Sequence, residues 1–287
     1  MTLARAQRRL LQAAAVLMFL VLAGATYQGV ATALERREFP HPGRLVDVGG
    51  HQLHLYCTGE GTPTVVLEAP AAGLSAAWGW IQPEIAEMTR VCSYDRAGLG
   101  WSEAGDGPFE PAQVPVQLRA LLEAAREKGP YVIAGQGLGA ALARLDAQGL
   151  GDAAVALVMI DLPSLVDPAE RVQQTRLVTL SPWLARAGVL RATPVLSAHA
   201  AGLPDPSQGA VRTFLNRPDH LTRAAREMAR WDEAVALASA AVLPERLHVI
   251  EVRAGRRGGV DFLSDQSDAA VVSRAILGAV AAATRRR

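Results

Sequence analysis

The sequence lacks an excess of charge of either sign. Its 29 Lys and Arg residues nearly balance its 28 Asp and Glu residues, which leaves a net charge of +1. Proteins that bind nucleic acid through its phosphates normally carry a basic surface, so this balance argues against that function class. Internal repeats and low-complexity tracts are absent too. Because half of the residues are hydrophobic and one fifth are charged, we expect a folded core. A chain of 287 residues can hold one large domain with an appendage, or two small domains.

Polar residues are nearly missing from the stretch between Leu10 and Tyr27, which only Gln12, Gly24 and Thr26 interrupt. This length is at the short end of a bilayer span, for which about 17–25 residues are needed. Three arginines precede the stretch, so the positive-inside rule places the N-terminus in the cytoplasm and the rest outside. We expect an uncleaved, single-pass anchor over residues 1–33, in contact with the membrane through residues 10–30. A linker over residues 34–43 follows it.

A cleaved signal peptide is the alternative, because Ala31-Thr32-Ala33 has the small-x-small form of a cleavage site. Either interpretation exports the domain that follows, as a membrane protein or as a secreted one. An exported domain can keep disulfides. The sequence has only two cysteines, Cys57 and Cys92, each in a β-like segment. Two buried free thiols are the other possibility.

Short apolar runs alternate with helical patterns after the linker. A hairpin-type turn separates the first two strands, and the later strands are apolar without alternation, as expected for strands buried on both faces. This order predicts an α/β fold, with a mostly parallel sheet flanked by helices. The predicted strands cover residues 44–48, 52–57, 64–68, 91–94, 131–134, 154–161 and 246–252.

Helical spacing without a convincing strand distinguishes residues 165–243, which we interpret as a helical cap inserted over the sheet. The core then has two parts. The first covers residues 44–164, and the second covers residues 244–287 with one strand and an amphipathic helix over about 268–283.

Two motifs resemble a known family. The stretch Asp95-Arg96-Ala97-Gly98-Leu99-Gly100-Trp101-Ser102 looks like the D-R-x-G-x-G-x-S signature of α/β-hydrolases. The turn Gly135-Gln136-Gly137-Leu138-Gly139 follows a strand and opens a helix, and it is similar to that family's nucleophile elbow, usually G-H-S-x-G. With its N-terminal segment, the chain resembles membrane-anchored bacterial α/β-hydrolases. The strand order of that family places Cys57 and Cys92 on neighbouring strands, which would allow a disulfide.

The chemistry of the elbow is missing. Its serine position holds Gly137, preceded by Gln136, and glycine has no side chain that can attack a substrate. Loss of the serine alone costs on the order of 10⁶ in rate in a well-studied protease. The family pattern places the histidine position at Val260, and no histidine follows His248, which begins a strand and which we interpret as structural. Asp161, at the end of its strand, is the candidate acid, although it could equally cap the following turn.

The loop that forms the family's oxyanion hole is altered as well. Relatives tend to have glycines after the third strand, whereas this chain has Pro70 and Ala71 there, and proline has no N–H to donate. The other N–H of the hole would come from Leu138. These losses predict a catalytically impaired relative of the α/β-hydrolases, a membrane-tethered binding or remnant domain. Its ligand under the cap is an unknown small molecule or protein, and we expect no cofactor and no metal.

Two alternatives stay open. An active ester- or amide-type hydrolase could use a displaced nucleophile, Ser75 or Ser102, although neither has an identifiable histidine partner and Ser102 looks structural. The pattern Gly135-x-Gly137-x-x-Ala140 also matches a dinucleotide-binding fingerprint, and it follows a strand and opens a helix. Such units normally open their domain, whereas here four predicted strands come first.

Overall fold

The computed structural model describes residues 2–162, 178–253 and 263–285. Within these ranges, seven strands form one sheet in the order β1-β2-β4-β3-β5-β6-β7. The β1–β2 and β2–β4 pairs are antiparallel, and all other neighbours are parallel, which confirms the predicted fold class. The strands are β1 (Arg44–Asp47), β2 (Gln52–Thr58), β3 (Thr64–Glu68), β4 (Val91–Tyr94), β5 (Tyr131–Gln136), β6 (Ala154–Ile160) and β7 (His248–Val252).

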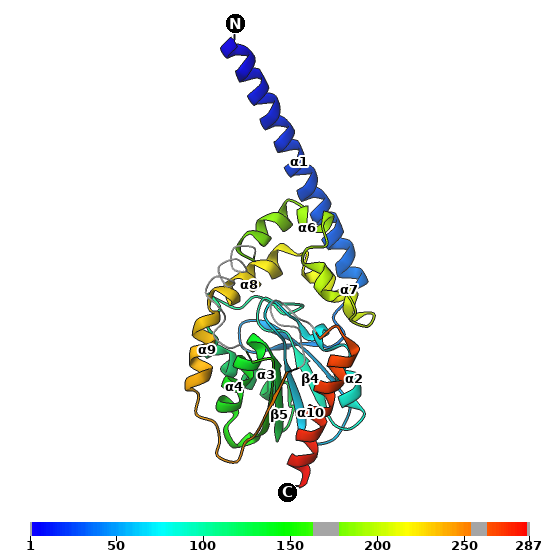
Figure 1. Cartoon of the computed structure of the whole chain (residues 1–287), viewed down its shortest axis with the longest axis vertical. Helices are drawn as coiled ribbons and strands as arrows, with labels where there is room; N and C mark the ends of the chain where they lie inside the picture. Colours follow the sequence, from blue (N-terminus) through cyan, green and yellow to red (C-terminus); the bar gives the residue numbers. More distant parts are fainter. Residues whose placement is uncertain (1, 163–177, 254–262, 286–287) are drawn as a thin grey trace.

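Helices cover both faces of the sheet, and further helices lie between the sheet and the N-terminal helix (Figure 1). The cap comprises α6 to α9, which lie between β6 and β7 in the sequence, within the predicted insertion. The described helices are α1 (Thr2–Glu38), α2 (Ile81–Ala86), α3 (Val114–Ala125), α4 (Leu138–Leu150), α6 (Val189–Ala192), α7 (Ser207–Phe214), α8 (Pro218–Ala229), α9 (Trp231–Ala240) and α10 (Gln266–Arg285).

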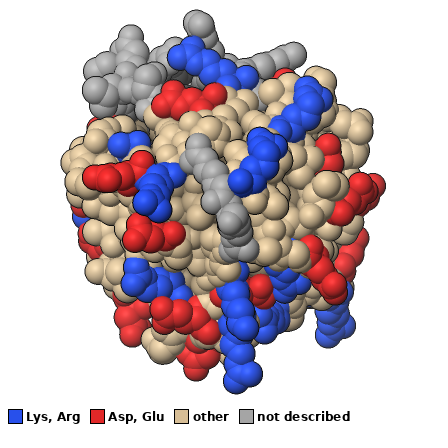
Figure 2. Space-filling model, turned by 90° about the horizontal axis from the view of Figure 1, so that it is seen from below, with Lys and Arg blue, Asp and Glu red and all other residues tan. Residues whose placement is uncertain are grey.

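The N-terminal part of α1 projects beyond the domain (Figure 1). Residues 5–38 are long and apolar enough to cross a membrane, and the most apolar window of this helix is not buried at all. The helix continues past the predicted boundary at residue 33, so that the first half of the predicted linker is helical and only residues 39–43 are irregular. At the opposite end of the domain, acidic and basic side chains are interspersed over the surface (Figure 2).

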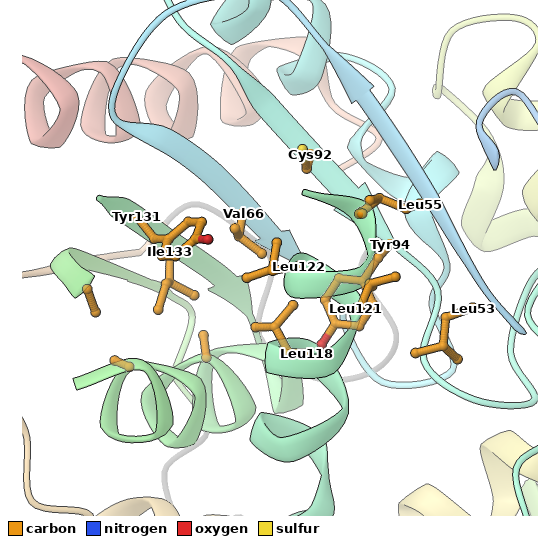
Figure 3. Packing of buried hydrophobic residues seen from close by; sticks show 14 of the residues in the cluster. Leu53, Leu55, Val66, Cys92, Tyr94, Leu118, Leu121, Leu122, Tyr131 and Ile133 are labelled. Carbon is orange, nitrogen blue, oxygen red and sulfur yellow. The ribbon is translucent and has the colours of Figure 1, made fainter. Parts of the chain in front are cut away.

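The core has two layers because successive side chains of a strand point to opposite faces. On one face, Val66 and Ile133 pack against Leu118 and Leu121 of α3, and all four are at most 1% exposed (Figure 3). On the other face, α2 and α10 cover the sheet, with Ile276 of α10 fully buried. Burying one such side chain contributes about 1.5–3 kcal/mol. α10 is also apolar enough to span a membrane, but this packing makes it a core helix.

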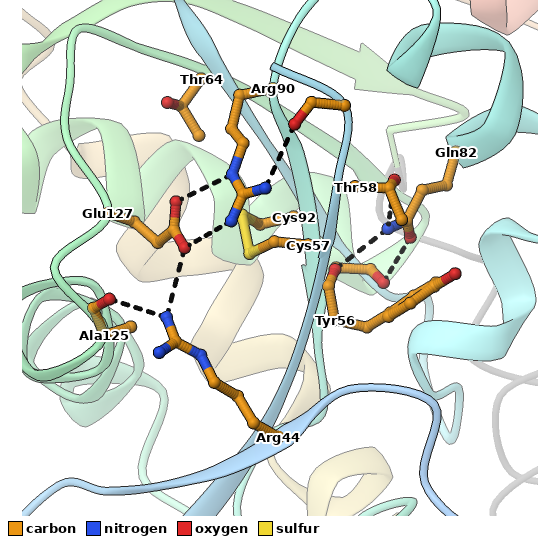
Figure 4. The surroundings of a disulfide bond; sticks show 12 residues. Arg44, Tyr56, Cys57, Thr58, Thr64, Gln82, Arg90, Cys92, Ala125 and Glu127 are labelled. Atoms are coloured by element: carbon orange, nitrogen blue, oxygen red, sulfur yellow. Dashed lines mark hydrogen bonds and ion pairs between the residues drawn. A yellow bond between two sulfur atoms is a disulfide. The ribbon is translucent and has the colours of Figure 1, made fainter. Parts of the chain in front are cut away.

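Cys57 and Cys92 form a disulfide that joins β2 to β4. The two residues are direct partners in the antiparallel register, as the family strand order implied. Glu127 lies beside the bridge, where it accepts two hydrogen bonds from Arg90 (Figure 4). The two sulfur atoms and the Glu127 carboxylate are close enough together to hold a metal ion, but the disulfide removes the thiolates that would bind one.

Replacing both cysteines by serine is expected to lower the free energy of unfolding by about 3–4 kcal/mol, because the bridge closes a long loop in the unfolded chain. The sequence separation of the two cysteines is 35 residues. Denaturant unfolding with and without reductant measures the effect. The chain has no other cysteine, so reductant should act on the wild type and not on the double variant. Equal stability of the wild type under both conditions would contradict the expectation.

Candidate functional site

The site lies where the strand order reverses. β4 follows β3 toward one edge of the sheet, and β6 and β7 follow β5 toward the other, so the ends of β3 and β5 flank a topological switch point. Open α/β sheets bind ligands at such a point, outside the carboxyl ends of the strands. Two segments meet here, the loop that follows β3 and the turn that joins β5 to α4.

The turn after β5 keeps the shape of a nucleophile elbow. Gly137 has φ +56° and ψ −124°, a conformation that costs a residue with a side chain about 1–3 kcal/mol. A Cβ atom added here would meet no atom within 4 Å, so the position has room for a serine. Gln136, buried at the end of β5, precedes it, and Leu138, also buried, begins α4. The turn therefore has a strained backbone and open space at position 137, where it carries no side chain.

The two outer glycines of the elbow are required by close packing. A Cβ atom on Gly135 would lie 2.2 Å from the carbonyl oxygen of Gly139 and 2.8 Å from the Cβ of Ala143. A Cβ atom on Gly139 would lie 2.3 Å from the carbonyl oxygen of Ala69. These contacts press α4 against the ends of β3 and β5, and they explain why the pattern also satisfies a dinucleotide fingerprint.

Several polar backbone groups of the loop after β3 are engaged by protein atoms. Arg96 donates to the carbonyl oxygens of Ala69 (2.7 Å) and Pro70 (3.0 Å). The N–H of Ala72 points to Glu227 Oε2 at 3.4 Å, and its carbonyl oxygen lies 2.9 Å from His220 Nε2. Ala71 is buried against α4 and α9. Since Pro70 has no N–H, the loop offers no free donor at Pro70 or Ala72 for an oxyanion.

Arg96 connects this loop to the cap. Its guanidinium is 3% exposed, and all five N–H groups are used: the two loop carbonyls, Glu68, and a bidentate pair with Glu227 of α8 at 2.6 and 3.0 Å. Glu68 also accepts a hydrogen bond from the Tyr94 hydroxyl. Burial, and then the charge of Glu68, raise the pKa of the neighbouring Asp146 carboxyl well above its usual range.

His220 provides a second link between α8 and the core. It is 2% exposed, donates from Nε2 to Ala72, and accepts at Nδ1 from the Gly100 N–H at 3.1 Å. Burial lowers the pKa of His220, which favours the neutral ring that these two bonds require. The sequence did not single out His220 or Glu227, because only the folded chain brings α8 to the loops that follow β3 and β4.

Asp95 of the loop motif organises a buried polar cluster. It accepts hydrogen bonds from His54 Nδ1 (3.0 Å), the Ser75 N–H (2.5 Å) and the Trp101 N–H (2.9 Å). Burial alone would raise the pKa of Asp95, but His54 and the other donors hold it below its usual value. Ser102 donates to the Asp95 carbonyl at 2.6 Å and accepts from the His54 N–H, a structural arrangement.

The expectation that Ser75 has no histidine partner is wrong. Its hydroxyl lies 3.3 Å from His54 Nδ1. Ser75, His54 and Asp95 therefore have the composition of a catalytic triad. The same Nδ1 contacts Asp95, and His54 Nε2 accepts a hydrogen bond from the Gly43 N–H at 3.2 Å. Because a catalytic base must offer a free nitrogen to the nucleophile, this trio does not form a catalytic triad.

Of the other predicted positions, Asp161 adjoins the elbow, because the residue before it, Ile160, pairs with Gln136 and accepts a hydrogen bond from the Gly137 N–H at 2.9 Å. Asp161 directly follows β6 with φ +49°, and its N–H donates to Val252 of β7. His248 starts β7, which runs parallel to β6 and pairs with it. His248 therefore lies at the amino ends of the strands, away from the site. Val260 lies outside the described residues.

A cavity of about 240 Å³ opens beside Arg96, between the cap and the start of α3. Arg223 of α8 lines it, with its guanidinium 5.4 Å from the ring centre of Phe109. The remaining lining residues are Ala97, Asp106, Pro108, Glu110, Gln113, Val114 and Gln117. The elbow is not among the lining residues.

Similar structures identify the fold. The Cif epoxide hydrolase from Acinetobacter nosocomialis has a TM-score of 0.66 at 12% identity, covering 89% of this chain and 96% of its own. The haloalkane dehalogenase DbeA from Bradyrhizobium elkani has a TM-score of 0.63 at 19% identity, covering 85% and 99%. An α/β hydrolase fold protein from Burkholderia ambifaria has a TM-score of 0.59 at 19% identity, covering 81% and 98%. The chain has the α/β-hydrolase fold.

Sequence comparisons add little. No protein-family model matches the chain. The "Probable transporter efuK" of Hormonema carpetanum is 29% identical over 97 residues, 32% of this chain and 14% of that protein. An uncharacterized protein of Schizosaccharomyces pombe is 29% identical over 114 residues, 39% of this chain and 21% of that protein. The chain thus spans only a small part of these curated relatives.

The elbow glycines should differ in their cost of replacement. Gly137→Ala should lower the free energy of unfolding by about 1 kcal/mol, because the new Cβ atom meets only backbone strain. Gly135→Ala should cost about 3 kcal/mol, because its Cβ atom would overlap a backbone carbonyl. Denaturant unfolding of the two matched variants measures both values. Equal losses of unfolding free energy, or a larger loss in Gly137→Ala, would contradict the close packing described at Gly135.

Proposed function

We propose that this chain is a membrane-tethered domain of α/β-hydrolase fold that has lost serine-hydrolase activity and retains a binding role beneath its cap. The observation that carries the proposal is Gly137, which occupies the nucleophile position of an otherwise intact elbow, with open space where a side chain would be. A missing side chain in an intact turn removes the chemistry and leaves the fold in place.

The positions of the histidines support the loss of activity. The sequence has six histidines, and all of them fall within the described residues. The two that lie near the site, His54 and His220, have both ring nitrogens engaged by protein atoms. His248 lies at the amino ends of the parallel strands, opposite the site. A serine placed at position 137 would therefore find no free imidazole to take its proton.

The contacts of α1 support an uncleaved anchor. Its C-terminal half packs on the cap, where Arg191 donates to Gln28 Oε1 (2.6 Å), Thr32 and both oxygens of Glu35. The Arg191 side chain is only 6% exposed. Cleavage after residue 33 would remove Gln28 and Thr32 and leave this buried guanidinium with fewer partners, which is costly. A retained helix keeps the domain attached to the membrane.

We expect a ligand to bind where the cap meets the core. The cavity beside Arg96 combines the aromatic residue Phe109 with Arg223 and with acidic and amide residues. Its volume of about 240 Å³ is below that of a drug-sized pocket, about 300–1,000 Å³, which favours a small polar ligand.

Turnover of p-nitrophenyl acetate and butyrate by the full chain in detergent micelles tests the proposal. The full chain is used because α1 is part of the packed domain. We expect rates equal to the buffer blank for the wild type and also for Gly137→Ser, since the restored hydroxyl has no base.

Saturable turnover by the wild type would contradict the proposal. Its loss in Ser75→Ala, with retention in Ser102→Ala, would then identify Ser75 as a displaced nucleophile. A rise in melting temperature with NAD, on the same preparation, would instead favour the dinucleotide alternative.

A further inference from the structure

One face of α1 packs against the cap from Gly24 onward. Positions 24, 28, 31, 32 and 35 recur at helical spacing, and each is at least half-buried, whereas the other residues from 21 to 38 are exposed. Gln28 is 5% exposed and donates from Nε2 to the carbonyl oxygen of Asn216 at 2.8 Å. At the start of this stripe, a Cβ atom on Gly24 would lie 2.0 Å from the carbonyl oxygen of Ala187. The helix and the cap backbone therefore touch at Gly24.

This contact limits the free length of α1. Residues 10–23 are exposed and apolar except for Gln12, and at 1.5 Å per residue they extend about 21 Å. The hydrocarbon core of a bilayer is about 30 Å thick. Continuing the span to Tyr27, just before the buried Gln28, gives about 27 Å. The contact between Gly24 and Ala187 then lies about 5 Å inside the boundary of the hydrocarbon core.

The cap residues beside this contact are apolar and exposed. Leu180 and Trp183 are 56% and 70% exposed and lie on one face of the helical residues 178–186. Val189, two residues after Ala187, is 42% exposed. The Arg186 guanidinium lies 5.2 Å from the Trp183 ring centre. Tryptophan favours the interface between membrane and water, where an arginine beside it can reach lipid phosphates.

We infer that the cap inserts the edge formed by Leu180, Trp183 and Val189 into the boundary between headgroups and acyl chains of the bilayer that α1 spans. The inference rests on the proposed membrane tether and adds a second membrane contact to it. A depth of about 5 Å agrees with that of elements lying in the interface, about 5–10 Å. The opposite end of the domain carries interspersed charges and faces away from the membrane (Figure 2).

Spin labelling of the full chain in phospholipid nanodiscs tests this placement. The native cysteines are bonded to each other, so one introduced cysteine gives one labelled site. Labels at Leu180→Cys and Trp183→Cys report on the cap edge, and a label at Leu17→Cys reports on the anchor. Val242→Cys is the matched control, since Val242 is 77% exposed in the α9–β7 connection, at the end opposite α1 (Figure 1).

Collision rates with oxygen, which concentrates in lipid, and with a water-soluble nickel chelate locate each label. We expect oxygen to dominate at Leu17, Leu180 and Trp183, and the nickel chelate to dominate at Val242. Nickel dominating at Leu180 and Trp183, with Leu17 still in lipid, would overturn the insertion of the cap and leave the tether intact. Nickel dominating at Leu17 as well would overturn the tether itself.

Discussion

A buried guanidinium that loses a partner destabilises the fold strongly. The contacts of Arg96 therefore hold three parts of the chain together. Arg96 joins the end of β3 through Glu68, the loop after β3 through two carbonyl oxygens, and the cap through Glu227. Removing one partner of a buried ion pair typically costs about 3–5 kcal/mol. His220 reinforces the same junction from the same helix. The cap is thereby attached to the loop after β3, through Ala72, and to the loop after β4, through Gly100.

Close packing determines two of the three glycines in the turn between β5 and α4. Gly135 and Gly139 are held by contacts that leave no space for a side chain, whereas position 137 has space for one. The backbone angles of Gly137 are costly for other residues, so glycine stabilises this turn. The nearby Ser75, His54 and Asp95 resemble a catalytic trio in composition, but their hydrogen bonds serve packing.

The sequence predicted the fold and the tight turn between β5 and α4, because both follow from local patterns. Apolar runs marked β3, β5 and β6, and the glycine pattern marked the elbow. The contacts of Glu227, His220 and His54 could not be predicted, because they join residues far apart in the chain whose local surroundings carry no signal. The packing of α1 on the cap was missed for a related reason: apolar composition predicts a membrane helix but not the polar stripe around Gln28.

Hydrogen–deuterium exchange of the full chain in detergent micelles is the most direct test of a cap fixed to the core. The amides of α8 should then be protected nearly as well as those of β5, because α8 can open only by exposing Arg96 and Glu227. Exchange in α8 that is many times faster than in β5 under native conditions would mean that the cap opens independently, and it would contradict this description.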